Sequence, residues 1–347
     1  MKAGLIYGLM PHHLDHVGVF AHMANIPLIV TEPFIADQAR TFYPDLEVIY
    51  WEALEIPEKV VTQFDTIYCS IPRPLFEESF FFAQKLLKKT VHTIWLPHGN
   101  SDKGHLAPSF EGLEHDKTAL VYGQKMIDFL KQKNVFKHLD IFTLGNFRYA
   151  YYQKYQSFYD TLVDKLVSTH KNVVLYAPTW QDAENSSSFQ NAWPILIEKL
   201  PPHYALVIKP HPNLSCPNIP HHPDVFVLQD FPPIYPLLNR TGIYIGDMSS
   251  IGYDFLTFNR PMYFLNPNRR DPIGDPGLFL QRCGKTVYPE EYPQIYNFFE
   301  EQRHLSQVRR DVYDYTFSNV KQFDKDFFKW RKNSLAFIQA LRHISTI

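Results

Sequence analysis

The sequence predicts two doubly wound α/β domains, each built on a parallel sheet with helices on its faces. Short runs rich in β-branched and aromatic residues alternate with helical patterns along the chain, which is typical of a parallel sheet. The alternation occurs twice, once on each side of a polar and aromatic stretch near residues 150–170. The chain has 347 residues, 45% of them hydrophobic, so it is long and apolar enough to form two cores.

The first expected domain covers residues 1–150. Seven runs in it have the composition of strands and lie at residues 3–7, 27–30, 48–51, 66–71, 92–96, 118–122 and 140–144. Apolar residues at helical spacing predict helices over residues 16–24, 77–89 and 124–133. Lysines close the second of these helices, which suits the negative end of a helix dipole.

The second expected domain covers residues 171–313 and follows a connecting helix over residues 151–170. Its expected strands lie at residues 172–178, 205–210, 225–229, 242–247 and 261–265, and its expected helices at residues 193–200, 234–240 and 250–258. Residues 314–347 are expected to be helical. Sheets of this kind bind ligands beyond the carboxyl ends of their strands, so we expect a cleft between the two domains.

Composition narrows the classes of function. A formal net charge of −2 argues against a protein that coats duplex nucleic acid. The three cysteines stand far apart without a C-x-x-C spacing, so we expect no disulfide framework and a reducing compartment. The N-terminus does not resemble a signal peptide, and no uninterrupted apolar run is long enough to span a bilayer.

The segment WLPHGNSDKGH places a base, a cation and two glycines directly after the expected strand at residues 92–96. His98 accepts a proton near neutral pH, which makes it a candidate general base. Lys103 carries a point charge that suits a phosphate, and Gly99 lets the backbone approach a ligand. The alternative is a Gly-Asn-Ser turn with incidental charge.

Two further strand ends carry residues of the same kind. LYAPTWQ reaches Thr179, which either caps a helix or binds phosphate. VIKPHPN places Lys209 and His211 among prolines, which restrict the loop and pre-organise both side chains. A Lys-x-His pair at a strand end favours a site over a structural histidine.

GIYIGDMSS ends an expected strand at Asp247 and opens a helix with Ser249 and Ser250. Hydroxyl groups and free N–H groups at a helix N-terminus favour an anion, and Gly252 in the first turn is expected to favour phosphate. The alternative is an ordinary serine N-cap.

The segment MPHHLDH follows the first expected strand. His13 and His16 have a spacing that metal ligands use, but no further set of ligands has a recognisable spacing. We therefore expect contact with an acceptor substrate here rather than a metal site.

Taken in order, these motifs resemble the CDP-glycerol glycerophosphotransferase family, which includes teichoic-acid primases and polymerases. The resemblance covers residues 90–290. The segments that carry it are His98-Gly99 with Lys103, Gly145 to Arg148, Pro178 to Gln181, Lys209 to Pro212, Asp247 to Ser250 and Arg260 to Phe264.

The resemblance implies a glycosyltransferase-B fold, in which two Rossmann-like domains face a cleft and the last helix crosses back to the first domain. It implies transfer of a polyol phosphate from CDP-glycerol, or a related CDP-polyol, to a hydroxyl of a cell-surface glycan or lipid-linked acceptor, with release of CMP. The sequence shows no required cofactor. A cytoplasmic protein with contact to the inner face of the membrane is expected, without a nucleic-acid partner.

The resemblance also implies roles for the candidate residues. His98 is the expected base, and His211 is the second catalytic residue, which stabilises charge on the departing CMP. The expected ligands of the donor are Lys103, Arg148, Thr179, Lys209, Asp247, Ser249 and Ser250. The expected acceptor-side residues are His13, His16 and Asp102.

The chain departs from the family pattern in three places. Gln181 replaces an arginine, Met248 replaces a tyrosine, and Asn146-Phe147 replaces Tyr-Pro. Because of these departures, a nucleotide sugar is an alternative donor to a CDP-polyol. Two other functions are open: a nucleotide-sugar glycosyltransferase or UDP-N-acetylglucosamine 2-epimerase of the same fold, and a non-catalytic nucleotide-binding module. The His-Gly loop favours the glycerophosphotransferase, and a pure binder would not need a base.

Overall fold

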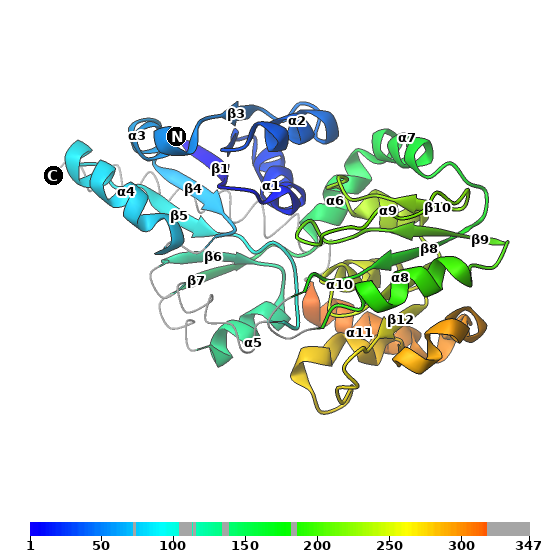
Figure 1. The fold of residues 1–347 in the computed structure, drawn as a ribbon. Helices are drawn as coiled ribbons and strands as arrows, with labels where there is room; N and C mark the ends of the chain where they lie inside the picture. The colour runs from blue at the N-terminus through cyan, green and yellow to red at the C-terminus, as the bar shows by residue number, and fades with distance from the viewer. Residues whose placement is uncertain (72–73, 104–112, 114–115, 134–138, 182–185, 318–347) are drawn as a thin grey trace. The chain divides into compact units, whose positions relative to one another are not determined.

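A computed structural model describes residues 1–71, 74–103, 113, 116–133, 139–181 and 186–317 (Figure 1). The chain forms two compact units. Among the described residues, the first unit contains those within 1–98, 109–151 and 314–317, and the second contains those within 99–103 and 152–313. Most of the helical segment expected at residues 314–347 lies outside the described residues.

The first unit is built on a seven-stranded parallel sheet with the order β3-β2-β1-β4-β5-β6-β7. The strands are β1 (Lys2–Ile6), β2 (Leu28–Val30), β3 (Val48–Tyr50), β4 (Thr66–Cys69), β5 (His92–Trp95), β6 (Thr118–Val121) and β7 (Asp140–Thr143). The helices are η1 (Pro11–Asp15), α1 (Val17–Ala24), α2 (Pro33–Phe42), η2 (Ala53–Glu55), α3 (Ile56–Gln63), α4 (Pro74–Leu87) and α5 (Gln124–Gln132). All seven strand predictions are confirmed.

The second unit is built on a six-stranded parallel sheet with the order β10-β9-β8-β11-β12-β13. The strands are β8 (Asn172–Ala177), β9 (Tyr204–Ile208), β10 (Val225–Val227), β11 (Ile243–Gly246), β12 (Met262–Leu265) and β13 (Lys285–Val287). The helices are α7 (Gln156–Leu166), α8 (Phe189–Glu198), α9 (Tyr235–Arg240), α10 (Ile251–Phe255), η5 (Leu256–Phe258), η6 (Pro276–Cys283), η7 (Pro289–Phe298) and η8 (Arg303–Leu305).

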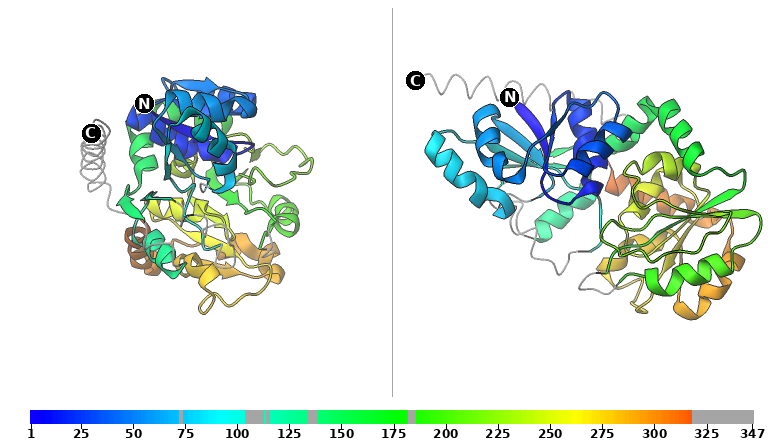
Figure 2. Two further views of the ribbon diagram at one scale, coloured as in Figure 1. Left: turned by 90° about the vertical axis from the view of Figure 1, so that its left-hand side faces the viewer. Right: turned by 45° about the horizontal axis from the view of Figure 1, so that its top comes forward.

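Successive side chains of a strand point to opposite faces of the sheet. Because neighbouring residues of these strands are apolar, both faces of each sheet are covered. In β1, Leu5 packs in a cluster with α3, whereas a side chain at Gly4 would meet Val17 of α1. In β11, Ile245 packs in the cluster of α8 and η7, whereas Tyr244 stacks on Phe255 of α10. Helices lie on the outside of each sheet in both further views (Figure 2). The prediction of two doubly wound parallel sheets is confirmed.

Two of the segments that pass from one unit to the other are helical. The expected single connecting helix is instead two, α6 (Phe147–Lys154) and α7, with a break at Tyr155, whose φ and ψ are not helical. Helix α11 (Ser306–Thr316) leads back to the first unit, where the Tyr315 hydroxyl donates to Asp128 at 3.1 Å. Phe317 then packs edge-on against Tyr122, with 5.7 Å between ring centroids.

Candidate active-site residues

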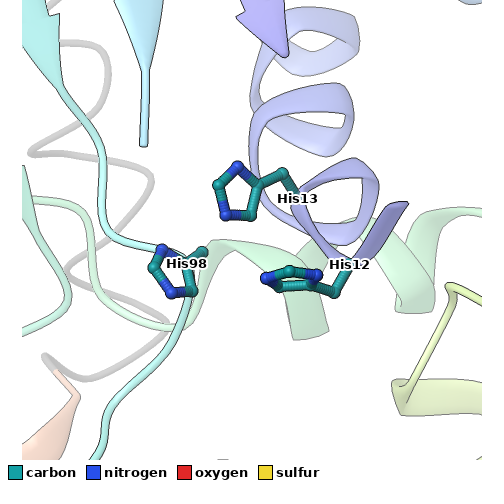
Figure 3. Close-up of side chains that lie close together, drawn as sticks. All are labelled: His12, His13 and His98. Carbon is teal, nitrogen blue, oxygen red and sulfur yellow. The ribbon is translucent and has the colours of Figure 1, made fainter. Parts of the chain in front are cut away.

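Three histidines come together in the first unit and are called the histidine cluster here: His12, His13 and His98 (Figure 3). His12 and His13 belong to η1, which follows β1, and His98 follows β5. The strands are parallel, so both segments leave the sheet at its carboxyl edge. The rings of His13 and His98 are stacked with 4.5 Å between centroids, and one nitrogen from each ring lies within 4.8 Å of the others.

Two members of the histidine cluster, His13 and His98, are neutral at pH 7. His13 is 2% exposed, and its pKa lies well below the usual value because of burial first and then the neighbouring His98 and His12. Desolvation by the surrounding atoms lowers the pKa of His98 to about 4, although part of this side chain reaches solvent. A neutral imidazole retains one lone pair, so His98 has the form that a general base requires.

A buried chain of hydrogen bonds ends at the residue before His98. Arg148 Nη1 donates to His16 Nε2 at 3.3 Å, which leaves the ring proton on His16 Nδ1 facing the Tyr122 hydroxyl. Tyr122 in turn donates to the carbonyl of Pro97 at 3.2 Å. The tautomer follows from the donors and acceptors of this chain. Tyr122 and His16 therefore help to position the backbone that carries His98.

This chain of hydrogen bonds places two candidate residues in the core of the first unit. Arg148 was expected to bind the donor, but it lies in the first unit, is 3% exposed, and forms an ion pair with Asp15 at 2.8 Å. His16 was expected to face the acceptor, but it is buried between Arg148 and Tyr122, and burial lowers its pKa well below the usual value. Both residues are polar parts of the core.

The segment after His98 belongs to the second unit. Lys103 Nζ contacts Thr179 Oγ1, in the loop that follows β8, and lies 5.8 Å from the centroid of the Trp180 ring. Asp102 accepts hydrogen bonds from the Tyr253 hydroxyl and, at 2.9 Å, from the backbone N–H of Leu280. Asp102 was expected on the acceptor side, whereas in the structure its carboxylate fastens this segment to the second unit.

His211 lies in the loop after β9, beside Trp180, with 6.1 Å between ring centroids. Its Nδ1 accepts the backbone N–H of Asn213 at 3.1 Å, so in the neutral ring the proton lies on Nε2. An N–H group at this position can donate to a phosphate oxygen. The amino group of Lys209 has a different partner. This side chain is buried, and its Nζ donates to the carbonyl of Gln229 at 3.1 Å. This contact is structural and does not support the expected donor role of Lys209.

Asp247 organises the edge of the second sheet. Its Oδ1 accepts the N–H of Thr179 at 2.8 Å, and its Oδ2 accepts the N–H and hydroxyl of Ser188 at 2.9 and 2.8 Å. Burial raises the pKa of Asp247, and these hydrogen bonds oppose the shift. We expected Asp247 to contact the donor, whereas the structure shows that it holds the Thr179 loop and the start of α8 in place.

Ser249 and Ser250 follow Asp247, and Ser250 is the N-cap residue of α10. Its side chain makes no capping hydrogen bond, so the alternative of an ordinary serine cap is not supported. The structure gives a packing reason for glycine at position 252, because a Cβ atom there would lie 2.6 Å from the Leu280 side chain. The glycine therefore allows close packing rather than approach of a phosphate.

Two partners of the site, Tyr122 and Ser188, were not identified in the sequence. Tyr122 and Ser188 stand in ordinary core and loop patterns, and no motif marks them. His12 was noticed as part of MPHHLDH, but its neighbour in space is His98, far along the chain. The pair considered for metal, His13 and His16, does not form, because His16 bonds to Tyr122 and Arg148 instead.

Comparison with known proteins identifies the protein family that this chain matches. The model of the family "CDP-Glycerol:Poly(glycerophosphate) glycerophosphotransferase" matches residues 118–329, which is more than half of the chain. No curated protein sequence matches the chain.

Several solved structures are similar in fold. The wall teichoic acid polymerase TagF aligns with a TM-score of 0.67 at 13% identity, over 99% of this chain and 90% of that one. A TagF variant soaked with CDPG aligns with a TM-score of 0.64 at 12% identity, over 99% and 89%. The UDP-GlcNAc 2-epimerase from Neisseria meningitidis, bound to UDP-GlcNAc, aligns with a TM-score of 0.57 at 14% identity, over 95% and 100%. These likenesses establish a glycosyltransferase-B-like fold.

Proposed function

We propose, from the premise that the chain belongs to the CDP-glycerol:poly(glycerophosphate) glycerophosphotransferase family, that it transfers glycerol phosphate or a related polyol phosphate from a CDP-linked donor to an acceptor hydroxyl. Membership of this family makes it a glycerophosphotransferase-type enzyme. The finer points are the donor, the acceptor and the residues that act on them.

The observation that carries the proposal is the contact of Lys103 with Thr179. Strands β9, β8 and β11 are neighbours in the second sheet, so the loops after them lie along one carboxyl edge. Those loops carry His211, Thr179 and the pair Ser249 and Ser250. Lys103 adds a cation to the Thr179 loop. Cationic, N–H and hydroxyl groups at one edge suit the pyrophosphate of a nucleotide donor.

The covalent chain keeps the candidate base near this edge. His98 belongs to the first unit and Lys103 to the second, and five peptide links join them. Five residues span at most ~18 Å even when fully extended, so the two Cα atoms stay within that distance in any arrangement of the units. The segment thus links the base that would act on the acceptor to a cation that would bind the donor.

The proposed reaction forms one bond and breaks one. The acceptor oxygen attacks the phosphorus that carries the polyol, and the bond from that phosphorus to the oxygen shared with CMP breaks. His98 takes the hydroxyl proton, and CMP leaves with the bonding electron pair. Hydrogen bonds from His211 Nε2 and the serine hydroxyls, together with the charge of Lys103, stabilise the growing negative charge on CMP. No covalent intermediate on the protein is needed.

A ligand screen by thermal unfolding tests the donor. A ligand that binds only the folded protein stabilises it by ~2.7 kcal/mol at 100 times its Kd, so a true donor raises Tm in a concentration-dependent way. We expect CDP-glycerol, CDP-ribitol, CDP or CMP to raise Tm, and UDP and UDP-GlcNAc not to. His211→Ala is expected to weaken CDP-glycerol binding ~10- to 100-fold, because it removes a hydrogen bond to a charged group.

The control for this prediction is His304→Ala, which removes an exposed histidine of the same unit. Its response to CDP-glycerol should equal that of the unchanged protein. A response to uridine nucleotides alone would support the epimerase or sugar-transferase alternative. No response to any nucleotide would contradict the proposed donor site.

We also propose that helix α4 touches a membrane that carries the acceptor. Phe82 and Leu86 are 70% and 81% exposed, and Phe81 and Leu87 are exposed as well. Lys85 and Lys88 stand exposed among them. Apolar side chains between lysines suit a surface of anionic lipid. In the described part of the chain, no helix combines the length and the apolar character needed to cross a membrane.

Vesicle binding checks this contact. The triple variant Phe81→Ser, Phe82→Ser and Leu86→Ser is expected to bind anionic vesicles at least ~10-fold more weakly, since burial of each such side chain contributes ~1.5–3 kcal/mol. Leu54→Ser with Ile273→Ser is the control, because Leu54 and Ile273 are exposed apolar residues outside α4. Equal binding by the triple variant and the control would contradict the proposal.

The acceptor is proposed to be a hydroxyl of a lipid-linked or cell-surface glycan, and the similarity in fold to a wall teichoic acid polymerase supports this proposal. A protein that uses a cytidine nucleotide and such an acceptor would work in the cytoplasm at the inner face of the membrane. His13 is the remaining acceptor-side candidate. Its ring lies against His98, so it is placed to contact the same substrate as the base.

A further inference from the structure

We propose that the histidine cluster binds one divalent transition-metal ion, with His12, His13 and His98 as ligands. The three ligand nitrogens lie within 4.8 Å of one another, and the rings converge from η1 and from the segment after β5 (Figure 3). Nitrogens that share a tetrahedral zinc ion at ~2.0–2.1 Å lie ~3.3 Å apart. The rings therefore need to approach by at most ~1.5 Å, and the partly exposed His98 has room to rotate.

His13 supplies the second, independent observation. Its side chain is 2% exposed, and neither ring nitrogen has a hydrogen-bond partner among the described residues. A buried polar group without a partner costs folding free energy, so such a side chain is uncommon in a core without a ligand. A metal ion between His12 and His98 would bind one of these nitrogens.

The chemistry of the donor set favours Zn²⁺, Co²⁺ or Ni²⁺. Imidazole nitrogen suits these ions, and the cluster includes no carboxylate that would favour Mg²⁺ or Ca²⁺. Three imidazoles would leave a fourth tetrahedral position for water or an oxygen ligand.

Metal binding and base catalysis at His98 exclude each other. A neutral imidazole has one lone pair, and a ring that uses it to bind metal can no longer accept a proton. Added Zn²⁺ is therefore expected to inhibit transfer reversibly, with a chelator restoring activity. This consequence rests on the proposed function, whereas metal binding itself does not.

Calorimetric titration of the chelator-treated full-length protein with Zn²⁺, without any nucleotide, tests the site. We expect one equivalent to bind, and tetrahedral Co²⁺ to give visible absorption. His12→Ala, His13→Leu and His98→Ala should each weaken binding at least ~10-fold, while His304→Ala should leave it unchanged. Because no donor is present, this result is independent of whether the protein transfers glycerol phosphate.

His13→Leu keeps the test valid if other variants fold poorly. The imidazole of His13 makes no hydrogen bond to any residue that the structure describes, and leucine replaces it with an apolar side chain. The metal-free variant should therefore unfold at the same Tm as the unchanged protein or at a higher one. Zn²⁺ should then raise the Tm of the unchanged protein and not that of His13→Leu. Absence of saturable Zn²⁺ binding, or undiminished binding by His13→Leu, would overturn the proposal.

Discussion

Replacing His98 with alanine is expected to lower kcat for glycerol-phosphate transfer by ~10²- to 10⁴-fold, the usual contribution of a positioned general base. The reason is local, because His98 is neutral and partly reaches solvent. Its backbone is positioned through Tyr122, which bonds to the preceding Pro97. The measurement is steady-state release of CMP from CDP-glycerol in the presence of a chelator, so that no bound metal obscures the base.

The accompanying measurement is donor affinity. His98 lies in the first unit, whereas Lys103, Thr179 and His211 lie in the second, so His98→Ala should bind CDP-glycerol as well as the unchanged protein does. A fall in kcat with the same Kd separates loss of the base from loss of the donor site. Turnover at the unchanged rate in His98→Ala would remove His98 from the mechanism.

The fold was predictable because its signals are local and repeated. β8 and β11 are almost wholly buried, and runs of apolar residues such as those at 173–177 and 243–246 are typical of strands covered on both faces. β13 was missed because its three residues, KTV, carry too little pattern. The break between α6 and α7 was missed as well, because Tyr155 is an ordinary residue whose conformation depends on its surroundings.

The candidate site was predictable where the residue and its role lie in one loop. Thr179, His211 and Ser250 follow parallel strands, so their common edge follows from the strand order. The contacts of Asp102 and Arg148 were not predictable, because sequence spacing does not show which groups a charged side chain faces. Asp102 meets Tyr253 and Leu280, and these partners lie far away along the chain.

The correction for Arg148 leads to the second large prediction. Arg148→Met is expected to destabilise the protein by ~3–5 kcal/mol, since breaking a buried ion pair leaves its partner charged and unpaired in the core. The partner is Asp15, whose side chain is 9% exposed and which also accepts a hydrogen bond from the Tyr43 hydroxyl at 3.2 Å. The measurement is the urea concentration at the midpoint of unfolding. The dependence of the unfolding free energy on urea concentration should be the same for the variant and the unchanged protein.

A double variant separates the ion pair from its surroundings. Asp15→Leu with Arg148→Met removes both charges, so it should be less destabilised than Arg148→Met alone. Arg148→Met also removes the N–H group that donates a hydrogen bond to His16. That hydrogen bond is the first of the series that leads through Tyr122 to Pro97. Its kcat should therefore fall while its Kd for CDP-glycerol stays unchanged. If Arg148→Met instead has normal stability and binds CDP-glycerol poorly, Arg148 is a ligand of the donor. That result would also contradict the role of these hydrogen bonds in positioning His98.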